Sequence, residues 1–291
     1  MVVSVLSGKG GTGKTTIVAA LSELARKVIK IDCDVDAPNL FLLYKGHDIE
    51  KKDFSGSKIA VIDSQLCVQC DACEKVCKFD AIHHSKIDLF QCEGCGACLL
   101  VCPQHAIRLE DQTTAETFLT QTQKGIISRA EMEIGSDGSG KLVTQLRKNA
   151  EKIQEKDSLV IMDGSPGLGC AVIASITDTD IALIVTEPTK SGLNDLARIM
   201  ELTEHFDTQV FVCINKCDIN LEMAAEIESY SKEKNVPVIG KIPFDPMVME
   251  AVNSLRPITE MEGSIAKTAI EKMWVLLEGI IIKKTLQKEH K

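Results

Sequence analysis

A glycine-rich stretch near the start of the chain, residues 8–16 (GKGGTGKTT), constrains the fold more than any other feature. It follows an apolar run at residues 2–6 and contains the pattern Gly-x4-Gly-Lys-Thr of a phosphate-binding loop. Such a loop works between a strand and the first turn of a helix, where backbone N–H groups and the helix dipole both favour phosphate. The stretch therefore predicts a strand at residues 2–6, a helix at residues 14–27 and an α/β fold.

The residue types of this loop match the chemistry of a nucleotide. The Lys14 ammonium is expected to contact the β- and γ-phosphates, and the Thr15 hydroxyl is expected to ligate Mg²⁺. Glycines allow backbone N–H groups to point at phosphate oxygens. We predict that the loop binds nucleotide through Gly8, Lys9, Gly10, Gly11, Thr12, Gly13, Lys14, Thr15 and Thr16. The pattern needs only one lysine, so Lys9 requires a separate explanation.

Short β-branched runs alternate with helical patterns along most of the remaining chain. Strands are expected at residues 28–32, 158–162, 181–186, 209–214 and 238–242. Helices are expected at residues 192–205, 221–234 and 247–255, and a long one from residue 264 towards the C-terminus. This alternation predicts a doubly wound, mostly parallel sheet with crossover helices.

Composition and charge indicate which kinds of partner and which cellular compartment to expect for this chain. The net charge of −9 and pI of about 5.3 disfavour nucleic acid as a major partner, because binding to its phosphates needs clustered Lys and Arg. The phosphate loop begins at Gly8, which leaves no room for a signal sequence, so a cytoplasmic protein is expected. No apolar run reaches the roughly 18 residues of a membrane-spanning helix. In a reducing compartment, the twelve cysteines are expected to be metal ligands or catalytic thiols.

Eight of the twelve cysteines form an internal repeat between residues 67 and 102. Each copy reads C-x2-C-x2-C-x3-C, and the second follows the first at an offset of 25 residues. This spacing is typical of bacterial ferredoxins, in which the fourth cysteine of each run serves the other cluster. We predict two [4Fe–4S] clusters, one held by Cys67, Cys70, Cys73 and Cys102 and the other by Cys92, Cys95, Cys98 and Cys77. A pair of zinc sites is the alternative, but zinc ribbons separate their CxxC pairs by roughly a dozen or more residues.

The repeat also interrupts the alternation of strands and helices. A repeat of this length indicates two copies of one small unit inserted into a larger domain. We expect a small α+β domain of the bacterial ferredoxin kind at residues 59–110. The larger P-loop domain is then formed by residues 1–58 and 111–291.

The lysine early in the loop, within KGGTGKTT, resembles the deviant Walker A motif of the MinD/ParA/nitrogenase-iron-protein class of ATPases. In that class the early lysine crosses a dimer interface and touches the nucleotide bound by the other subunit. The resemblance implies that Lys9 has this role and that the chain forms a homodimer around two ATP molecules. The alternative is that Lys9 is a solvated loop lysine.

Further segments resemble the same class in chain order and imply roles for individual residues. Asp34, in the segment DCDVDAPN, matches the residue that orients the attacking water, and Asp163 matches the residue that holds Mg²⁺. Together with Lys9 and Lys14, these two aspartates are the implied catalytic residues. Asn215 matches the adenine-reading position, and Pro243 and Phe244 match the segment that closes the adenine pocket. Asp36 and Asp245 are equally well explained as turn or cap residues.

A P-loop ATPase of this class with ferredoxin motifs inserted after Asp34 resembles the MinD-superfamily ATPases that contain an inserted ferredoxin domain. Clusters with complete sets of fixed ligands suit electron transfer, so we expect an ATP-dependent protein that delivers electrons to a redox or metallocofactor-assembly partner. One alternative is an ATPase that carries or assembles iron–sulfur clusters. Another is a MinD-like positioning ATPase whose clusters are structural or sensory.

Two further features leave alternatives open. Cys170 lies seven residues after Asp163, as one bridging-cluster cysteine does in the nitrogenase iron protein, but a shared cluster needs two thiolates per chain and no convincing second cysteine is present. The apolar stripe of the last helix, followed by Lys283 and Lys284, is compatible with a membrane tether. Helices with such a stripe usually pack on their own sheet, so membrane attachment is not expected.

Overall fold

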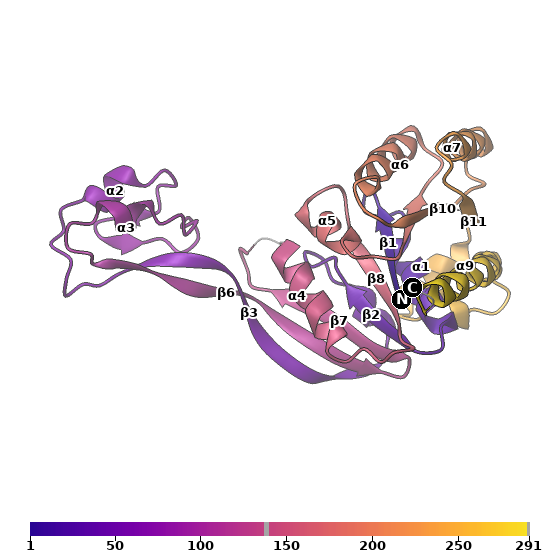
Figure 1. The fold of residues 1–291 in the computed structure, drawn as a ribbon, viewed down its shortest axis with the longest axis horizontal. Coiled ribbons are helices and arrows are strands. Elements are labelled where there is room, and N and C mark those ends of the chain that lie inside the picture. Colours follow the sequence, from indigo (N-terminus) through magenta and orange to yellow (C-terminus); the bar gives the residue numbers. More distant parts are fainter. Residues whose placement is uncertain (137–139, 290–291) are drawn as a thin grey trace. The chain divides into compact units, whose positions relative to one another are not determined.

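The computed structural model describes residues 1–136 and 140–289, and its ribbon is drawn in Figure 1. The chain divides into two compact units. Within the described residues, the large unit contains residues 1–51, 118–130 and 140–289, and the small unit contains residues 52–117 and 131–136. The small unit includes the expected insertion at residues 59–110 and extends beyond it on both sides.

The large unit is built on a mixed sheet with the strand order β11-β10-β9-β1-β8-β2-β7-β6-β3. The strands are β1 Val2–Ser7, β2 Val28–Asp32, β3 Gly46–Ile62, β6 Ile107–Thr122, β7 Gly125–Met132, β8 Leu159–Pro166, β9 Ile181–Thr186, β10 Gln209–Asn215 and β11 Val238–Ile242. All pairs from β11 to β7 are parallel. Strands β3 and β6 contribute residues to both units. The predicted α/β fold with a mostly parallel sheet is therefore confirmed.

Strands β3, β6 and β7 are absent from the sequence-based expectation. Strand β3 reads GHDIEKKDFSGSKIAVI, and its charged residues hide the period-two pattern of a half-buried strand. The turn between β6 and β7 ends at Gly125, whose φ is 77° and whose added Cβ would lie 1.9 Å from the Val28 carbonyl oxygen. A two-residue connection of this kind joins antiparallel strands, so β6 reverses direction relative to β7.

Helices cover both faces of the sheet, as a doubly wound fold requires. They are α1 Lys14–Leu24, α4 Gly140–Glu151, α5 Cys170–Ile176, α6 Lys190–Thr203, α7 Leu221–Glu233, α8 Pro246–Asn253 and α9 Ile265–Glu289, with short 3₁₀ turns at Leu40–Leu43 and Ile258–Glu260. One buried apolar cluster contains residues of α1, α8 and α9, and a second contains residues of α5, α6 and α7. Helix α1 ends three residues earlier than expected, because the chain becomes extended at Ala25.

Helix α9 packs on the sheet of its own unit. Ala266, Ile270, Met273, Trp274 and Leu277 are all buried in the apolar cluster that also contains α1. The core therefore accounts for these five side chains, whereas other apolar side chains of α9 are exposed, namely Ile265, Val275, Leu276, Ile282 and Leu286. Within the described part of the chain, no helix combines the length and apolarity that crossing a bilayer demands.

The small unit contains two short helices, α2 Ala72–Val76 and α3 Ala97–Val101, and a hairpin of β4 Ile82–His83 with β5 Lys86–Ile87. The sequence repeat is also a repeat of backbone conformation. Positive φ angles recur at the same offset of 25 residues, at Gln69 and Gly94, at Asp71 and Gly96, and at Asp80 and His105. Asp71 and Gly96 are the N-caps of α2 and α3, so each cysteine run folds around a left-handed turn followed by one helical turn.

Candidate nucleotide site and cysteine cavities

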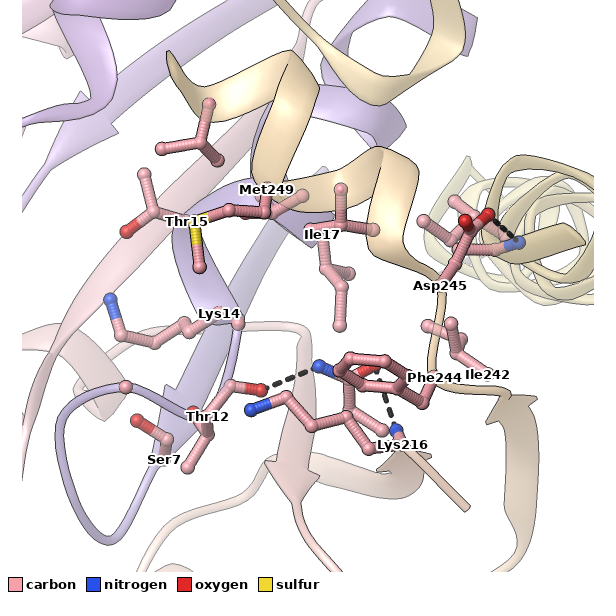
Figure 2. A pocket seen from close by; sticks show the side chains of 18 of the residues that line it. Ser7, Thr12, Lys14, Thr15, Ile17, Lys216, Ile242, Phe244, Asp245 and Met249 are labelled. Carbon is pink, nitrogen blue, oxygen red and sulfur yellow. Dashed lines mark hydrogen bonds between the residues drawn. The ribbon is translucent and has the colours of Figure 1, made fainter. Parts of the chain in front are cut away.

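A cavity of about 430 Å³ lies beside the phosphate loop in the large unit (Figure 2). The predicted nucleotide residues that line it are Gly10, Gly11, Thr12, Gly13, Lys14, Thr15, Thr16, Asp34, Asn215, Pro243 and Phe244. Gly8 and Lys9 lie outside the lining. At Gly8 the loop packs against α6, where an added Cβ would lie 2.2 Å from the Asp195 Cβ. The structure thus brings residues from four distant segments of the chain around one cavity.

The phosphate loop leaves donor groups without side-chain caps. Gly13 is the N-cap of α1 in a left-handed conformation, and no side chain caps that helix end. The first N–H groups of a helix need partners, and an anion satisfies them. Thr12 is 3% exposed, and its Oγ1 has no hydrogen-bond partner among the described residues. These unpaired donors suit a phosphate group.

Three aspartates surround the buried ammonium of Lys14. Lys14 forms an ion pair with Asp163, whose second carboxylate oxygen, Oδ2, is buried with no partner among the described residues. Burial lowers the pKa of Lys14, but Asp163, Asp32 and Asp34 outweigh that effect and raise it above its usual value. Asp34 is half-buried, and its pKa is raised, mainly by burial. The pair of carboxylates at Asp34 and Asp163 is therefore placed beside the phosphate loop.

Asp32 is the member of this group that the sequence analysis passed over. It is fully buried, and its carboxylate accepts hydrogen bonds from the backbone N–H groups of Asp34, Asn39 and Leu40 at 3.1–3.2 Å. Burial, followed by the charge of Asp163, raises its pKa to about 7. Asp32 fixes the loop that carries Asp34. The alternating aspartates of the sequence DCDVD were the available signal.

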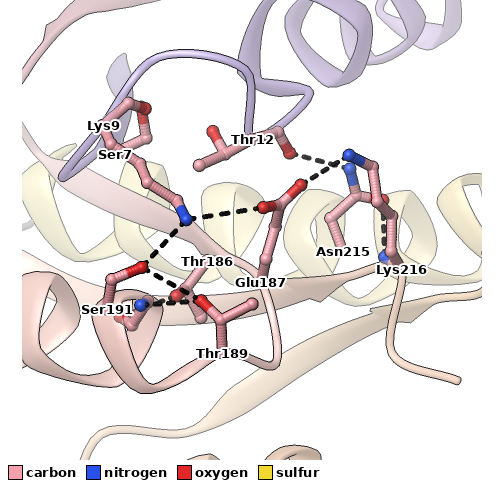
Figure 3. A network of polar contacts seen from close by, with 10 residues as sticks. Ser7, Lys9, Thr12, Thr186, Glu187, Thr189, Ser191, Asn215 and Lys216 are labelled. Carbon is pink, nitrogen blue, oxygen red and sulfur yellow. Dashed lines mark hydrogen bonds and ion pairs between the residues drawn. The ribbon is translucent and has the colours of Figure 1, made fainter. Parts of the chain in front are cut away.

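A second polar network joins the loop to the ends of β9 and β10 (Figure 3). Lys9 Nζ donates to Ser191 Oγ at 3.1 Å and lies 3.7 Å from Glu187 Oε2. Lys216 Nζ donates to Glu187 Oε1 at 2.6 Å. Lys9 therefore contacts its own chain here, and its role across a dimer interface stays a prediction. Sequence analysis assigned no role to Glu187 or Lys216.

Asn215 uses both ends of its amide within the chain. Its Nδ2 donates to the Thr12 carbonyl at 2.8 Å, and its Oδ1 accepts from the Lys216 N–H at 3.0 Å. A Cβ at Gly13 would lie 2.4 Å from this amide nitrogen, so β10 and the phosphate loop are in close contact. Asn215 lines the cavity and fixes the loop, while adenine recognition by its side chain stays a prediction.

The small unit contains two cysteine-lined cavities. One is lined by Cys67, Cys70, Cys73 and Cys102, and the other by Cys77, Cys92, Cys95 and Cys98. These are the two ligand sets that the spacing predicts. Backbone N–H groups of Ala60, Ala81 and Ala106 donate to the sulfur atoms of Cys92, Cys77 and Cys102 at 3.3–3.4 Å. Backbone N–H groups thus already face sulfur atoms in both cavities.

No three His, Cys, Asp or Glu side chains within residues 1–136 and 140–289 are placed to hold a single metal ion. A cubane cluster makes a different demand, because each thiolate binds its own iron at a separate corner. The four remaining cysteines belong to the large unit. Cys33 and Cys213 are buried, Cys217 is half-buried and Cys170 is exposed.

Comparison with known proteins gives consistent results for the fold. The model of the CobQ/CobB/MinD/ParA nucleotide binding domain family matches residues 3–258. An uncharacterised protein of Methanocaldococcus jannaschii is 38% identical over 226 residues, which cover 76% of this chain and 79% of that protein. The septum site-determining protein MinD of Pyrococcus horikoshii OT3, solved in complex with Mg-ADP, has a TM-score of 0.58 at 20% identity and covers 96% of each chain.

A shorter similarity involves a redox protein. One component of an ion-translocating oxidoreductase complex of Methanosarcina acetivorans is 33% identical over 78 residues. These residues cover 25% of this chain and 27% of that component.

Proposed function

This chain belongs to the CobQ/CobB/MinD/ParA nucleotide-binding family and is an ATP-binding NTPase of the MinD/ParA type, and we propose that it couples its nucleotide state to electron transfer. The proposed protein is a homodimer that hydrolyses MgATP in the large unit and holds two [4Fe–4S] clusters in the small unit. The observation that carries the proposal is the presence, in one chain, of a phosphate-loop cavity and two four-cysteine cavities.

The chain's own residues divide the work of phosphoryl transfer. Lys14 and the N–H groups at the start of α1 bind the β- and γ-phosphates, while Thr15 and Asp163 hold Mg²⁺. Lys14 and Asp163 are paired with each other in the structure, so nucleotide binding would separate them, with Lys14 facing phosphate and Asp163 among the residues that would hold magnesium. Asp34, half-buried at the cavity, orients the attacking water. Asn215, Pro243 and Phe244 surround the adenine.

The cysteine cavities fit the proposed clusters. Each cavity offers four thiols from both copies of the repeat, and backbone N–H groups already point at three of the sulfur atoms. The clusters would supply one-electron transfer. Hydrogen bonds and nearby charges around a cluster set its potential, so Ala60, Ala81 and Ala106 are the positions whose N–H groups tune it. Complete ligand sets favour clusters that stay bound over clusters that are handed on.

Chain order suggests how the two activities are linked. The chain enters β3 shortly after Asp34 and Asp36, and β3 contributes residues to both units. The segment that carries Asp34 is therefore followed, after a short 3₁₀ turn, by the strand that leads to the cysteines. We expect nucleotide binding to change the environment of the clusters by this route.

The proposed partner is a redox or metallocofactor-assembly protein. Residues 52–117 and 131–136 contain six Lys and Arg against twelve Asp and Glu, so the small unit carries most of the chain's excess negative charge. A partner that docks there is expected to present a basic surface, and its association rate is expected to fall with ionic strength.

Potentiometry on anaerobically purified protein tests the proposal. We expect about eight iron and eight sulfide per chain, since each [4Fe–4S] cluster contains four of each. The midpoint potential of the clusters is expected to shift on addition of MgATP in the wild-type protein and in Cys170→Ser. The Lys14→Ala variant is expected to show no shift. Zinc in place of iron would refute the cluster assignment, and equal potentials with and without MgATP would refute the coupling.

Two other functions fit the family. In a cluster-carrier ATPase, iron and sulfide would leave the protein for an apo-acceptor during turnover. In a MinD-like positioning ATPase, binding to acidic vesicles would depend on ATP. The fold similarity to MinD favours the second candidate, and the exposed apolar side chains of Val275, Ile282 and Leu286 on α9 are compatible with a membrane tether.

A further inference from the structure

Glu187 is the common partner of two lysines that approach it from opposite sides (Figure 3). Lys216, at the end of β10, lines the cavity and donates to one carboxylate oxygen at 2.6 Å. Lys9, in the phosphate loop, lies 3.7 Å from the other oxygen and donates to Ser191 at 3.1 Å. The Glu187 side chain is 12% exposed, whereas Lys9 is 36% exposed. A nearly buried anion thus holds an accessible lysine.

The backbone around Glu187 is fixed by several contacts. Thr186 Oγ1 donates to the Gly192 carbonyl at 2.9 Å, and Thr189 Oγ1 accepts from the Gly192 N–H at 2.9 Å as the N-cap of α6. A Cβ at Gly192 would lie 2.2 Å from the Glu187 carbonyl oxygen, so the corner is tightly packed. Glu187 is therefore held in place by its own segment, whereas the Lys9 side chain is long and partly exposed.

Release of Lys9 would not leave Glu187 as an unpaired buried charge. Removing the sole partner of a buried charge is strongly unfavourable, but Lys216 remains bound at the shorter distance. The contact with Lys9 is longer and more exposed, which makes it weak. We call this contact between Lys9 and Glu187 the latch. It is strong enough to position Lys9 and weak enough to break when Lys9 finds another anion.

We propose that Glu187 positions Lys9 on its own subunit and that this contact competes with the contact of Lys9 with the nucleotide of a second copy. The inference rests on the proposed homodimer. Glu187 is a positioning residue here, because it acts on the nucleotide only through Lys9. Its effect is to raise the protein concentration at which the nucleotide-bound chains pair.

Self-association with magnesium and the non-hydrolysable analogue AMP-PNP tests this role. Sedimentation of the full chain is compared for the wild type and for Glu187→Gln, which keeps the shape of the side chain and removes its charge. A symmetric dimer opens two such ion pairs, which predicts a dimer dissociation constant about two- to thirtyfold lower in the variant. The matched control, Glu228→Gln, removes a carboxylate that pairs with exposed Lys241 elsewhere in the large unit, and it is expected to leave the constant unchanged.

Two further measurements separate a positioning role from a structural one. The affinity of dilute, monomeric protein for AMP-PNP is expected to be equal in the wild type and Glu187→Gln, whereas damage to the loop would lower it. The double variant Lys9→Ala/Glu187→Gln is expected to associate as weakly as Lys9→Ala. Equal or weaker association of Glu187→Gln would overturn the latch while leaving the homodimer intact. Absence of association in every variant would overturn the homodimer and the latch together.

Discussion

In the large unit, two layers of buried aliphatic side chains cover a mostly parallel sheet, whereas the buried apolar cluster of the small unit contains only Ala60, Ile82, Cys98 and Ile107 among the described residues. The side chains packed around that small core include four further cysteines of the repeat. Units of about 70 residues rarely bury enough apolar surface to be stable alone, and metals or disulfides usually supply the remainder. The comparison indicates that the large unit is held by its apolar layers and the small unit by its proposed clusters.

The largest expected effect comes from removing one cluster ligand. Cys98→Ser replaces a side chain that belongs both to a cysteine cavity and to the small core. We expect loss of that cluster and rapid proteolysis within residues 52–117, because cluster binding and folding are coupled there. Nucleotide binding by the large unit is expected to persist. Limited proteolysis with mass spectrometry, together with titration of AMP-PNP, measures both outcomes.

The control for this experiment is Cys170→Ser, which changes an exposed cysteine of the large unit. It is expected to keep full iron content and the wild-type cleavage pattern. A Cys98→Ser protein that lacks the cluster but resists proteolysis within residues 52–117 would contradict the idea that the clusters hold the small unit together. Its apolar core would then be sufficient to keep it folded.

The reciprocal change removes apolar surface from the large unit. Leu21, in α1, is fully buried, and Leu21→Ala is expected to lower the free energy of unfolding of that unit by about 2–5 kcal/mol. Urea unfolding can be followed by the fluorescence of Trp274, the chain's single tryptophan, which is 7% exposed in the same apolar cluster. The iron content of the folded protein is expected to stay at the wild-type value. Loss of iron in parallel with loss of stability would show that the two units do not unfold independently.

The sequence was sufficient to predict some parts of the fold and the site but not others. The phosphate loop and the mostly parallel fold could be predicted from the sequence. Each depends on a short segment with a recognisable pattern, namely a glycine-rich loop or a continuous apolar run. The spacing of the cysteines predicts two sets of four, and in the structure each set lines a separate cavity. Strands β3 and β6 could not be predicted, because charged residues interrupt their alternation, and β7 could not be predicted, because its buried run contains Ser128 and Arg129.

The polar contacts of the site were also beyond the sequence. Lys9 and Glu187 are 178 residues apart in the chain, and only the fold brings β9 beside the phosphate loop. Asn215 is a recognisable residue at the end of a strand, but its bond to the Thr12 carbonyl depends on the close approach at Gly13. Side-chain partners of this kind follow from packing between distant segments, which no local pattern encodes.

The smallest of these predicted effects on stability concerns a buried lysine in the core of the large unit. Lys30, on β2, is fully buried, and its Nζ lies 4.2 Å from the centre of the Tyr44 ring and donates to the Lys124 carbonyl. Burial lowers its pKa from 10.5 to about 8. Between these two values, the unfolded chain binds a proton that the folded chain lacks, so stability is expected to rise with pH. Below pH 8, Lys30 is charged in both the folded and the unfolded chain, so the free energy of unfolding is lowered by the full cost of burying that charge.

The change Lys30→Met keeps the aliphatic stem and removes the titrating group. Across pH 8 to 10.5, the wild type is expected to gain up to about 3 kcal/mol relative to this variant, since each unit of pKa shift corresponds to 1.36 kcal/mol. The difference between the two proteins is the relevant quantity, because burial raises the pKa of Cys33, which acts in the opposite direction with rising pH. Urea unfolding followed by Trp274 fluorescence gives the profile, and Lys27→Met, at a lysine that is 61% exposed, is the control. If the free energy of unfolding changed with pH in the same way in the wild type and in Lys30→Met, burial of the charged Lys30 would cost no stability. The core of the large unit would then accept a buried charge despite its apolar surroundings.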